Sequence, residues 1–432
     1  MRANRVRRSV RWLVAAVWVL VRVGTGHAFD VAALQRGGML RVGTTGDYAP
    51  FSVTQADTLA GFDIDLATRL AHDLGARLQQ VRVQWPDLAS SFENDRVDLV
   101  MSGVSIRPER ALIGRYSRPY ALSGAVALIR SEDRTRFPDR QALDRQGVRI
   151  AVNRGGYLEP LARKLFVHAT IEPVADNRSL PDRVLRGAAD AALTDDLEAR
   201  AWQRKEFSTV GPFSRDRKAI WIRPDAPQLA KWVDRWLRER ERDGWLRALR
   251  QRWLGSPMFA AAAADREAVL SDIELRCRMM PMVAATKVAQ GLPIEDPAQE
   301  QRVLDRVKVL AREVGIEPSE ITRLFSSLIR AAKAIQSASG TDPRAFAPSL
   351  ELLRGAISDL DGHLVRQLRA AARSVKPDEW RAGVREAVQV DNLNDAFKAD
   401  IAESLAHAHR LVRPASNPPQ SKSTPAAHAS GS

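Results

Sequence analysis

Two patterns of hydrophobic and polar positions follow one another along the chain and divide it in two. Between residues 38 and 255, short runs rich in β-branched residues alternate with amphipathic segments of helical period. The expected strands are 39–44, 97–103, 126–129, 149–152 and 219–222, and the expected helices include 63–75, 86–95 and 226–252. This alternation predicts an α/β architecture with parallel strands.

The second half of the chain has a purely helical pattern. Apolar residues recur at helical spacing over 265–290, 297–314, 318–338, 346–372 and 378–411, without a strand signal between them. The alanine run that ends at Ala264 is typical of a linker, and the tail is rich in Pro, Ser and Ala. We therefore expect an α/β domain over residues 29–255, a linker over 256–264, an all-α domain over 265–411 and a disordered tail over 412–432.

The first 28 residues have the pattern of a secretory signal peptide. A basic start precedes an apolar run of about ten residues, and Gly26 and Ala28 stand at the −3 and −1 positions of a cleavage site. An uncleaved anchor is the alternative, but a bilayer span needs about 20 apolar residues. The pattern predicts a periplasmic protein, and the absence of another long apolar run predicts no membrane contact after cleavage.

Charge and composition narrow the class of partner. The chain has 432 residues, 45% of them hydrophobic, and a net charge of +14, which places nucleic acid among the conceivable partners. Six arginines and no acids lie in the first 28 residues, so the mature chain carries +14 less six, or +8. The single Cys277 excludes an intramolecular disulfide, and the seven histidines lack ligand spacing. We expect no metal, no cofactor and no nucleic acid, but a small anionic ligand.

Candidate ligand contacts follow the strands of the α/β half. A Gly/Thr-rich turn holds Asp47 and Tyr48, and Ser102 and Gly103 follow a later strand. A second Gly-rich turn, 153–156, ends a strand and precedes a helix, where free backbone N–H groups favour an anion. Each of these features alone is common in α/β proteins.

Taken in order, these segments resemble the periplasmic solute-binding proteins of the polar amino-acid class. The resemblance is closer to the periplasmic cyclohexadienyl (prephenate/arogenate) dehydratases built on that fold, and it covers about residues 38–255. It implies two lobes with the ligand between them, closing to exclude water. The substrate-binding residues it implies are Asp47, Tyr48, Trp85, Ser102, Gly103, Arg110, Gly155, Gly156, Thr194, Asp195 and Lys218. Among these, Arg110 and Lys218 would bind ligand carboxylates.

One further residue would separate a dehydratase from a binding protein. The dehydratases have a glutamate three residues after the Gly-Gly turn, and Glu159 stands there in this chain, which implies a catalytic proton donor. The alternative is that Glu159 only complements a helix dipole. Likewise Asp195 could act as a helix cap, Trp85 as core packing and Arg110 as a surface residue. Tyr157 replaces the threonine that often follows the Gly-Gly turn in that family.

The helical half carries a second resemblance. Arg276 and Lys287 are eleven residues apart on one expected helix, which brings both cations to one face, and Pro281 between them loosens this estimate. Together with segments 291–300 and 329–336, they resemble the secreted, γ-class all-helical chorismate mutases over about residues 268–410. The resemblance implies that Arg276, Lys287 and Gln336 are catalytic, through electrostatic stabilisation of the transition state, and that Asp296 and Gln299 bind substrate.

Two departures from the mutase pattern weaken that site. Gln299 replaces an arginine, and the arginine expected on the fourth helix corresponds to His363 in a loose alignment. Arg302 and Arg330 are candidates to replace the lost cations. Asp296 with Pro297 is also a good helix start, a role that needs no substrate.

The resulting hypothesis is an exported bifunctional enzyme of phenylalanine biosynthesis. It would convert chorismate to prephenate in the all-α domain, and prephenate to phenylpyruvate, or arogenate to phenylalanine, in the α/β domain. One alternative is a periplasmic binding protein for amino acids or aromatic acids. The other is an active dehydratase with a degenerate mutase domain. The oligomeric state stays open.

Overall fold

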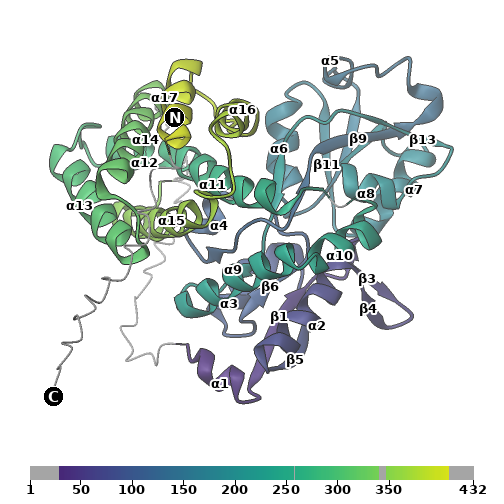
Figure 1. Cartoon of the computed structure of the whole chain (residues 1–432). Coiled ribbons are helices and arrows are strands. Elements are labelled where there is room, and N and C mark those ends of the chain that lie inside the picture. The colour runs from purple at the N-terminus through teal and green to yellow at the C-terminus, as the bar shows by residue number, and fades with distance from the viewer. Residues whose placement is uncertain (1–28, 257, 340–346, 408–432) are drawn as a thin grey trace, which may run out of the picture.

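The computed structural model describes residues 29–256, 258–339 and 347–407 (Figure 1). The expected signal peptide and the tail over 412–432 lie outside the described residues. The α/β half forms two lobes, drawn in purple and blue, and the green and yellow helices form a body beside them (Figure 1). None of the described helices has the length and apolarity that crossing a membrane requires.

Lobe 1 is built on a five-stranded sheet in the order β5-β1-β6-β15-β7. β1 pairs in parallel with β5 and β6, whereas β15 is antiparallel to β6 and β7. The strands are β1 (Met39–Thr44), β5 (Arg77–Arg82), β6 (Leu99–Val100), β7 (Arg115–Tyr116) and β15 (Trp221–Ile222). The other elements are α1 (Val31–Gln35), α2 (Phe62–Leu74), η1 (Trp85–Asp87), α3 (Leu88–Glu93), α4 (Pro108–Ala111) and a small sheet of β2 (Asp47–Tyr48), β3 (Ser52–Gln55) and β4 (Thr58–Ala60).

Lobe 2 repeats the plan with the sheet order β11-β10-β12-β9-β13. β10 is parallel to β11 and β12, and β9 is antiparallel to β12 and β13. The strands are β9 (Ala125–Arg130), β10 (Arg149–Asn153), β11 (Thr170–Val174), β12 (Ala191–Asp195) and β13 (Phe207–Val210). The helices are η2 (Ser131–Asp133), α5 (Arg140–Leu143), α6 (Leu158–Leu165), η3 (Asn177–Ser179), α7 (Leu180–Leu185) and α8 (Asp196–Ala201).

The chain crosses between the lobes through β8 (Ala121–Ser123) and β14 (Asp216–Lys218), which pair antiparallel. The expectation of parallel strands is met only in part, because strands next to these crossings run against their neighbours. Helices α9 (Pro227–Arg242) and α10 (Trp245–Leu254) then return to lobe 1. The single helix expected over 226–252 is broken at Gly244, whose φ of 86° lies in the left-handed region.

The helical domain consists of α11 (Ala261–Arg278), α12 (Met280–Ala289), α13 (Pro297–Val314), α14 (Pro318–Ala338), α15 (Leu350–Ala371), α16 (Pro377–Ala387) and α17 (Asp395–Ala406). α11 packs against α15 at the centre, and α16 pairs with α17. α13 and α14 have the expected bounds. α11 begins inside the span expected as a linker, and the helix expected over 265–290 is divided just before Pro281, which lacks a backbone N–H.

Buried ion pairs join the helical domain to the α/β half. Arg118 contacts Asp265 at 2.7 Å, and Arg217 contacts both Glu267, at 3.3 Å, and Glu274. A continuous hydrophobic core also runs from lobe 1 into the helices. Because removing one partner of a buried pair leaves an uncompensated charge, these contacts hold the two halves in a fixed arrangement.

Candidate functional site

A narrow cavity of about 30 Å³ lies between the two lobes. Its lining comes from lobe 1, from lobe 2 and from the crossing strand β14. The lining residues are Tyr48, Trp85, Gly103, Ser105, Arg110, Asn153, Gly156, Tyr157, Leu158, Asn177, Glu198 and Lys218. Because drug-sized ligands occupy cavities of about 300–1,000 Å³, the lobes are closed on each other in this structure.

Arg110 lies in the last turn of the short helix α4 and is only 8% exposed. Its Nη1 donates to the carbonyl oxygen of Ser105 at 3.4 Å, and its guanidinium lies 5.8 Å from the centre of the Trp221 ring. Burial lowers the pKa of Arg110, and no carboxylate in the described part of the chain forms an ion pair with it. A buried guanidinium without a counterion is suited to bind an anion.

Lys218 connects the two lobes at the floor of the cleft. Its Nζ donates to the Tyr48 hydroxyl and to Ser105 Oγ, both at 3.0 Å, and forms an ion pair with Asp195 at 3.1 Å. Asp195 caps α8 by accepting from two backbone N–H groups, and its other oxygen accepts from the Tyr48 hydroxyl. Asp195 thus acts as a helix cap and also reaches across the cleft.

Aromatic rings form one wall of the cavity. Tyr48 stacks on Phe51 at 5.3 Å and meets Trp85 edge-on at 5.4 Å, and Trp85 Nε1 donates to Asp47 Oδ1 at 3.1 Å. Gly103 has a φ of 59°, and a Cβ there would lie 2.5 Å from the Tyr48 ring. Only glycine at position 103 therefore allows the Tyr48 ring to lie this close to the turn.

Other predicted residues lie behind the cavity lining. Ser102 Oγ contacts the Thr45 hydroxyl at 2.7 Å, and Thr194 donates to Glu198 at 2.6 Å. The N–H of Gly103 donates to Asp63 at 2.5 Å, so in the closed cleft this donor already has a hydrogen-bond partner within the protein. Burial raises the pKa of Asp63 to about 7.

Glu159 lies beside the Gly-Gly turn, in the first turn of α6, and not among the lining residues. Its carboxylate accepts from the Gly155 N–H at 2.9 Å and from Arg163 at 3.1 Å. Although partial burial opposes the effect, these contacts lower the pKa of Glu159. Tyr157 lines the cavity, and the guanidinium of Arg107 from lobe 1 lies 5.8 Å from the centre of its ring.

Glu198 is a lining residue that the sequence did not single out. It is 1% exposed and accepts from the Asn177 amide and the Thr194 hydroxyl, each at 2.6 Å. Burial and the neighbouring Asp195 raise the pKa of Glu198 well above its usual range. The surroundings of Glu198 therefore favour the neutral form of its carboxyl group.

In the helical domain, Arg276 faces a carboxylate of the protein itself. Its Nε donates to Asp361 at 2.9 Å, and Arg306 contacts the other oxygen of Asp361 at 2.8 Å. The residue of α15 that contacts Arg276 is thus Asp361, two residues before His363, the position that the sequence comparison aligned with a mutase arginine. Two residues along a helix turn the side chain by about 200°, so His363 points away from Arg276.

The remaining predicted mutase residues lie on neighbouring helices. Lys287 donates to the Ile294 carbonyl at 2.5 Å, and burial lowers its pKa. Asp296 caps α13 and contacts Arg354 at 2.9 Å, while Gln299 accepts from Arg302 at 2.9–3.0 Å. Gln336 donates to Met280 Sδ at 3.6 Å, and its buried Oε1 lacks a hydrogen-bond partner among the described residues. Arg330 instead contacts Asp400 at 2.6 Å.

Comparison with known proteins adds to this geometry. Residues 40–256 match the profile of the bacterial extracellular solute-binding proteins, family 3, which is half of the chain. The chain belongs to this family. Residues 262–337, which follow the family 3 domain, match chorismate mutase type II.

The similar proteins include enzymes and binding proteins. A cyclohexadienyl dehydratase from Pseudomonas aeruginosa is 39% identical over 57% of this chain and 96% of its own length. An L-cystine-binding protein from Escherichia coli is 30% identical over 51% of this chain and 84% of its own. A crystal structure of an ancestral amino acid-binding protein, described as a precursor of cyclohexadienyl dehydratase, is 32% identical and covers 52% of this chain and 98% of its own, with a TM-score of 0.49.

Sequence reasoning missed several lining residues of the family 3 domain: Ser105, Asn153, Asn177 and Glu198. Glu198 stands three residues after the cap Asp195, a spacing that also suits a simple helix start. Asn153 ends β10 directly before the Gly-Gly turn, and the strand-end signal indicated the turn 153–156 but not the side chain of Asn153. Asn177 gives no local signal, because only the tertiary fold brings it to Glu198.

Proposed function

We propose that this protein is a bifunctional enzyme that acts on chorismate and then on prephenate. The helical domain rearranges chorismate to prephenate, and the cleft converts prephenate to phenylpyruvate, or arogenate to phenylalanine. One observation carries the proposal: a single chain joins a domain similar to cyclohexadienyl dehydratase to one that matches chorismate mutase type II. The product of the first reaction is the substrate of the second.

The cleft has the charges that the second reaction needs. Protonation of the C4 hydroxyl of prephenate releases water, and the ring carboxylate leaves as carbon dioxide. The electron pair of the broken C–C bond completes the aromatic ring. The enzyme must therefore hold two carboxylates and supply one proton, and Arg110 and Lys218 are the buried cations that we assign to the carboxylates.

Substrate binding requires the lobes to separate and close again. In the closed cleft Lys218 contacts Asp195, and the free volume of about 30 Å³ is too small for a ring with two carboxylates. We propose that a substrate carboxylate takes the place of Asp195 at Lys218. Asp195 then faces the hydroxyl end of prephenate or the amino group of arogenate.

We propose Glu159 as the proton donor. A dianionic substrate beside it would raise its pKa from the lowered value of the empty cleft. Its side chain is 21% exposed, so solvent can return the proton after each turnover. Glu198, in contrast, is buried away from water, and both of its oxygens accept hydrogen bonds from the protein.

The mutase reaction needs no proton donor. It needs cations for two carboxylates and a hydrogen-bond donor to the ether oxygen, which gains negative charge as the bond breaks. We assign Arg276 and Lys287 to the two carboxylates, Gln336 to the ether oxygen, and Asp296 and Gln299 to substrate binding.

We also propose that the protein is exported to the periplasm, since its family is extracellular and its first 28 residues have a signal-peptide pattern.

A second candidate function is a dehydratase whose helical domain lacks mutase activity. The observation that favours it is the buried contact of Asp361 with Arg276, which gives this cation an internal partner where a mutase would bind a substrate carboxylate. A third reading, a binding protein for amino acids, is supported by the 30% identity to an L-cystine-binding protein.

Separate assays with prephenate and with chorismate distinguish these readings. We expect purified mature protein to form phenylpyruvate from prephenate and to consume chorismate. Turnover of prephenate without consumption of chorismate would favour the second candidate. Saturable binding of prephenate or amino acids without turnover of either substrate would identify a binding protein and contradict the proposal.

A further inference from the structure

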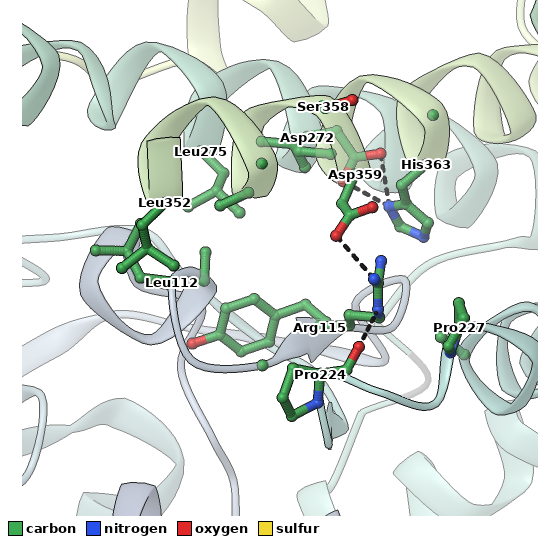
Figure 2. A pocket seen from close by; sticks show the side chains of 18 of the residues that line it. Leu112, Arg115, Pro224, Pro227, Asp272, Leu275, Leu352, Ser358, Asp359 and His363 are labelled. Carbon is green, nitrogen blue, oxygen red and sulfur yellow. Dashed lines mark hydrogen bonds and ion pairs between the residues drawn. The ribbon is translucent and has the colours of Figure 1, made fainter. Parts of the chain in front are cut away.

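A larger cavity, of about 750 Å³, lies where lobe 1 meets the helical domain. Figure 2 shows its walls, with Leu112, Arg115 and Pro224 on the lobe 1 side and Leu275, Leu352 and Asp359 on the helical side. This volume is within the range of small-molecule sites, and the cavity is separate from the cleft between the lobes.

Cations outnumber acids in the lining of this interdomain cavity. The ionisable lining residues are Arg115, Lys231, Arg306, Arg366 and His363 against Asp272, Glu351 and Asp359. Three of the cations already have partners: Arg115 contacts Asp359 at 2.8 Å, Arg306 contacts Asp361 at 2.8 Å, and His363 contacts Asp234 and Asp272. Among the described residues, the lining groups without an ion pair are Lys231 and Arg366 against the single acid Glu351, so one positive charge is left over.

Of these two cations, Arg366 is the stronger indication of an anion-binding site. It is half-buried on α15, and among the described residues no hydrogen bond or ion pair reaches its guanidinium. Burial lowers its pKa, although Asp234 and Asp272 oppose this at longer range. An unpaired, partly desolvated guanidinium gains free energy when a carboxylate completes its hydrogen bonds.

Apolar side chains make up much of the remaining wall. Leu112, Pro224 and Pro227 line the α/β side of the cavity, and Leu275, Leu310 and Leu352 line its helical side. Leu352 is 46% exposed, which is unusual for a large apolar side chain inside a domain interface. We propose that this cavity binds a small carboxylic acid with an apolar, ring-sized body, and that Arg366 holds the carboxylate.

The site is placed to influence both candidate catalytic sites. Leu112 lines the cavity two residues after Arg110 of the cleft, so a ligand would press on the turn that carries Arg110. On the other side, Arg306 connects the cavity through Asp361 to Arg276. The binding claim itself does not rest on either proposed reaction.

Binding of 3-phenylpropanoate to the full-length protein tests the proposal. The titration uses an Arg110→Gln background, so that a site in the cleft does not contribute. We expect saturable binding, and no binding of benzylamine, which has the same ring and the opposite charge. Adding Arg366→Gln should weaken binding of 3-phenylpropanoate about tenfold or more, because a charge-assisted contact is lost.

Arg373→Gln is the matched control, since Arg373 is exposed just beyond the end of α15, and it should leave the affinity unchanged. If circular dichroism shows that Arg366→Gln does not fold, Lys231→Gln on an exposed side chain replaces it and should weaken binding two- to threefold. Absence of saturable binding at millimolar concentration, or affinity that neither Arg366→Gln nor Lys231→Gln changes, would overturn the proposal.

Discussion

The pKa values of two glutamates near the cleft are shifted in opposite directions because their surroundings differ. Glu159 accepts from a backbone N–H and from Arg163, which favours its charged form. Glu198 is buried beside Asp195, which favours its neutral form. The glutamine substitution removes a carboxyl group at both positions, but only at Glu198 do the surroundings favour an uncharged side chain.

These substitutions test the assignment of the proton donor. Glu159→Gln should lower kcat for prephenate by about 100-fold or more, the usual contribution of a general acid, and leave substrate affinity within a few-fold. Glu198→Gln should change kcat little, because the surroundings of residue 198 favour an uncharged side chain. Steady-state kinetics decide between them, and the reverse order of effects would assign the proton to Glu198.

Asp361 is predicted to stabilise the fold through Arg276. Asp361→Asn leaves Arg276 buried without a full counter-charge, so the free energy of unfolding should fall by about 3 kcal/mol or more. Asp359→Asn on the same helix is the control, since Asp359 is 53% exposed and its ion pair with Arg115 should contribute less than about 1 kcal/mol. Urea unfolding measures both, and equal effects would contradict this account.

At the residue scale, the family resemblance indicated positions better than it indicated contacts. Arg110, Lys218, Tyr48 and Trp85, which the resemblance implied as substrate-binding residues, line the cleft. Local spacing could not reveal that Asp361 faces Arg276, because the two are 85 residues apart in sequence. Nor could it reveal that the Gly155 N–H is already occupied by Glu159.

At the scale of elements, His363 links three helices. Its Nε2 contacts Asp234 of α9 at 2.7 Å, and its Nδ1 contacts Asp272 of α11 at 2.9 Å. Although burial opposes it, the two carboxylates raise the pKa of His363 from 6.5 to about 10. The imidazolium is therefore charged at neutral pH and ties α15 to the α/β half.

This contact predicts how stability depends on pH. Because the pKa is raised by folding, the contribution of His363 is complete below pH 6.5 and is lost progressively as the pH rises to about 10. The midpoint temperature of thermal unfolding should fall more steeply between pH 6.5 and 10 for the wild type than for His363→Gln. Parallel slopes in thermal unfolding across pH 6.5–10 would refute the charged bridge.

Helix ends explain which elements the sequence could predict. α13 begins at Pro297 after the cap Asp296 and ends before Gly315, so its bounds are encoded locally. The division of the helix expected over 226–252 depends on Gly244, and an isolated glycine inside a helical pattern is an ambiguous signal. Strand β6 is only Leu99–Val100, because pairing with β1 and β15, and not hydrophobicity, sets its length.

At the scale of the whole molecule, the two domains form one docked body. Ion pairs, a shared hydrophobic core and the interdomain cavity lie between the helices and lobe 1. Prephenate released by the helical domain would therefore start close to the cleft of the same molecule. Docking of this kind raises the local concentration of the intermediate without requiring a channel.

The most direct test of the account is a time course of chorismate, prephenate and phenylpyruvate in a single reaction started with chorismate. The wild-type protein should convert chorismate to phenylpyruvate with little prephenate accumulating. Glu159→Gln should accumulate prephenate, and Arg276→Ala should leave chorismate unconverted yet still process added prephenate. A wild-type protein that forms no phenylpyruvate from chorismate would contradict the central claim that one chain performs both steps.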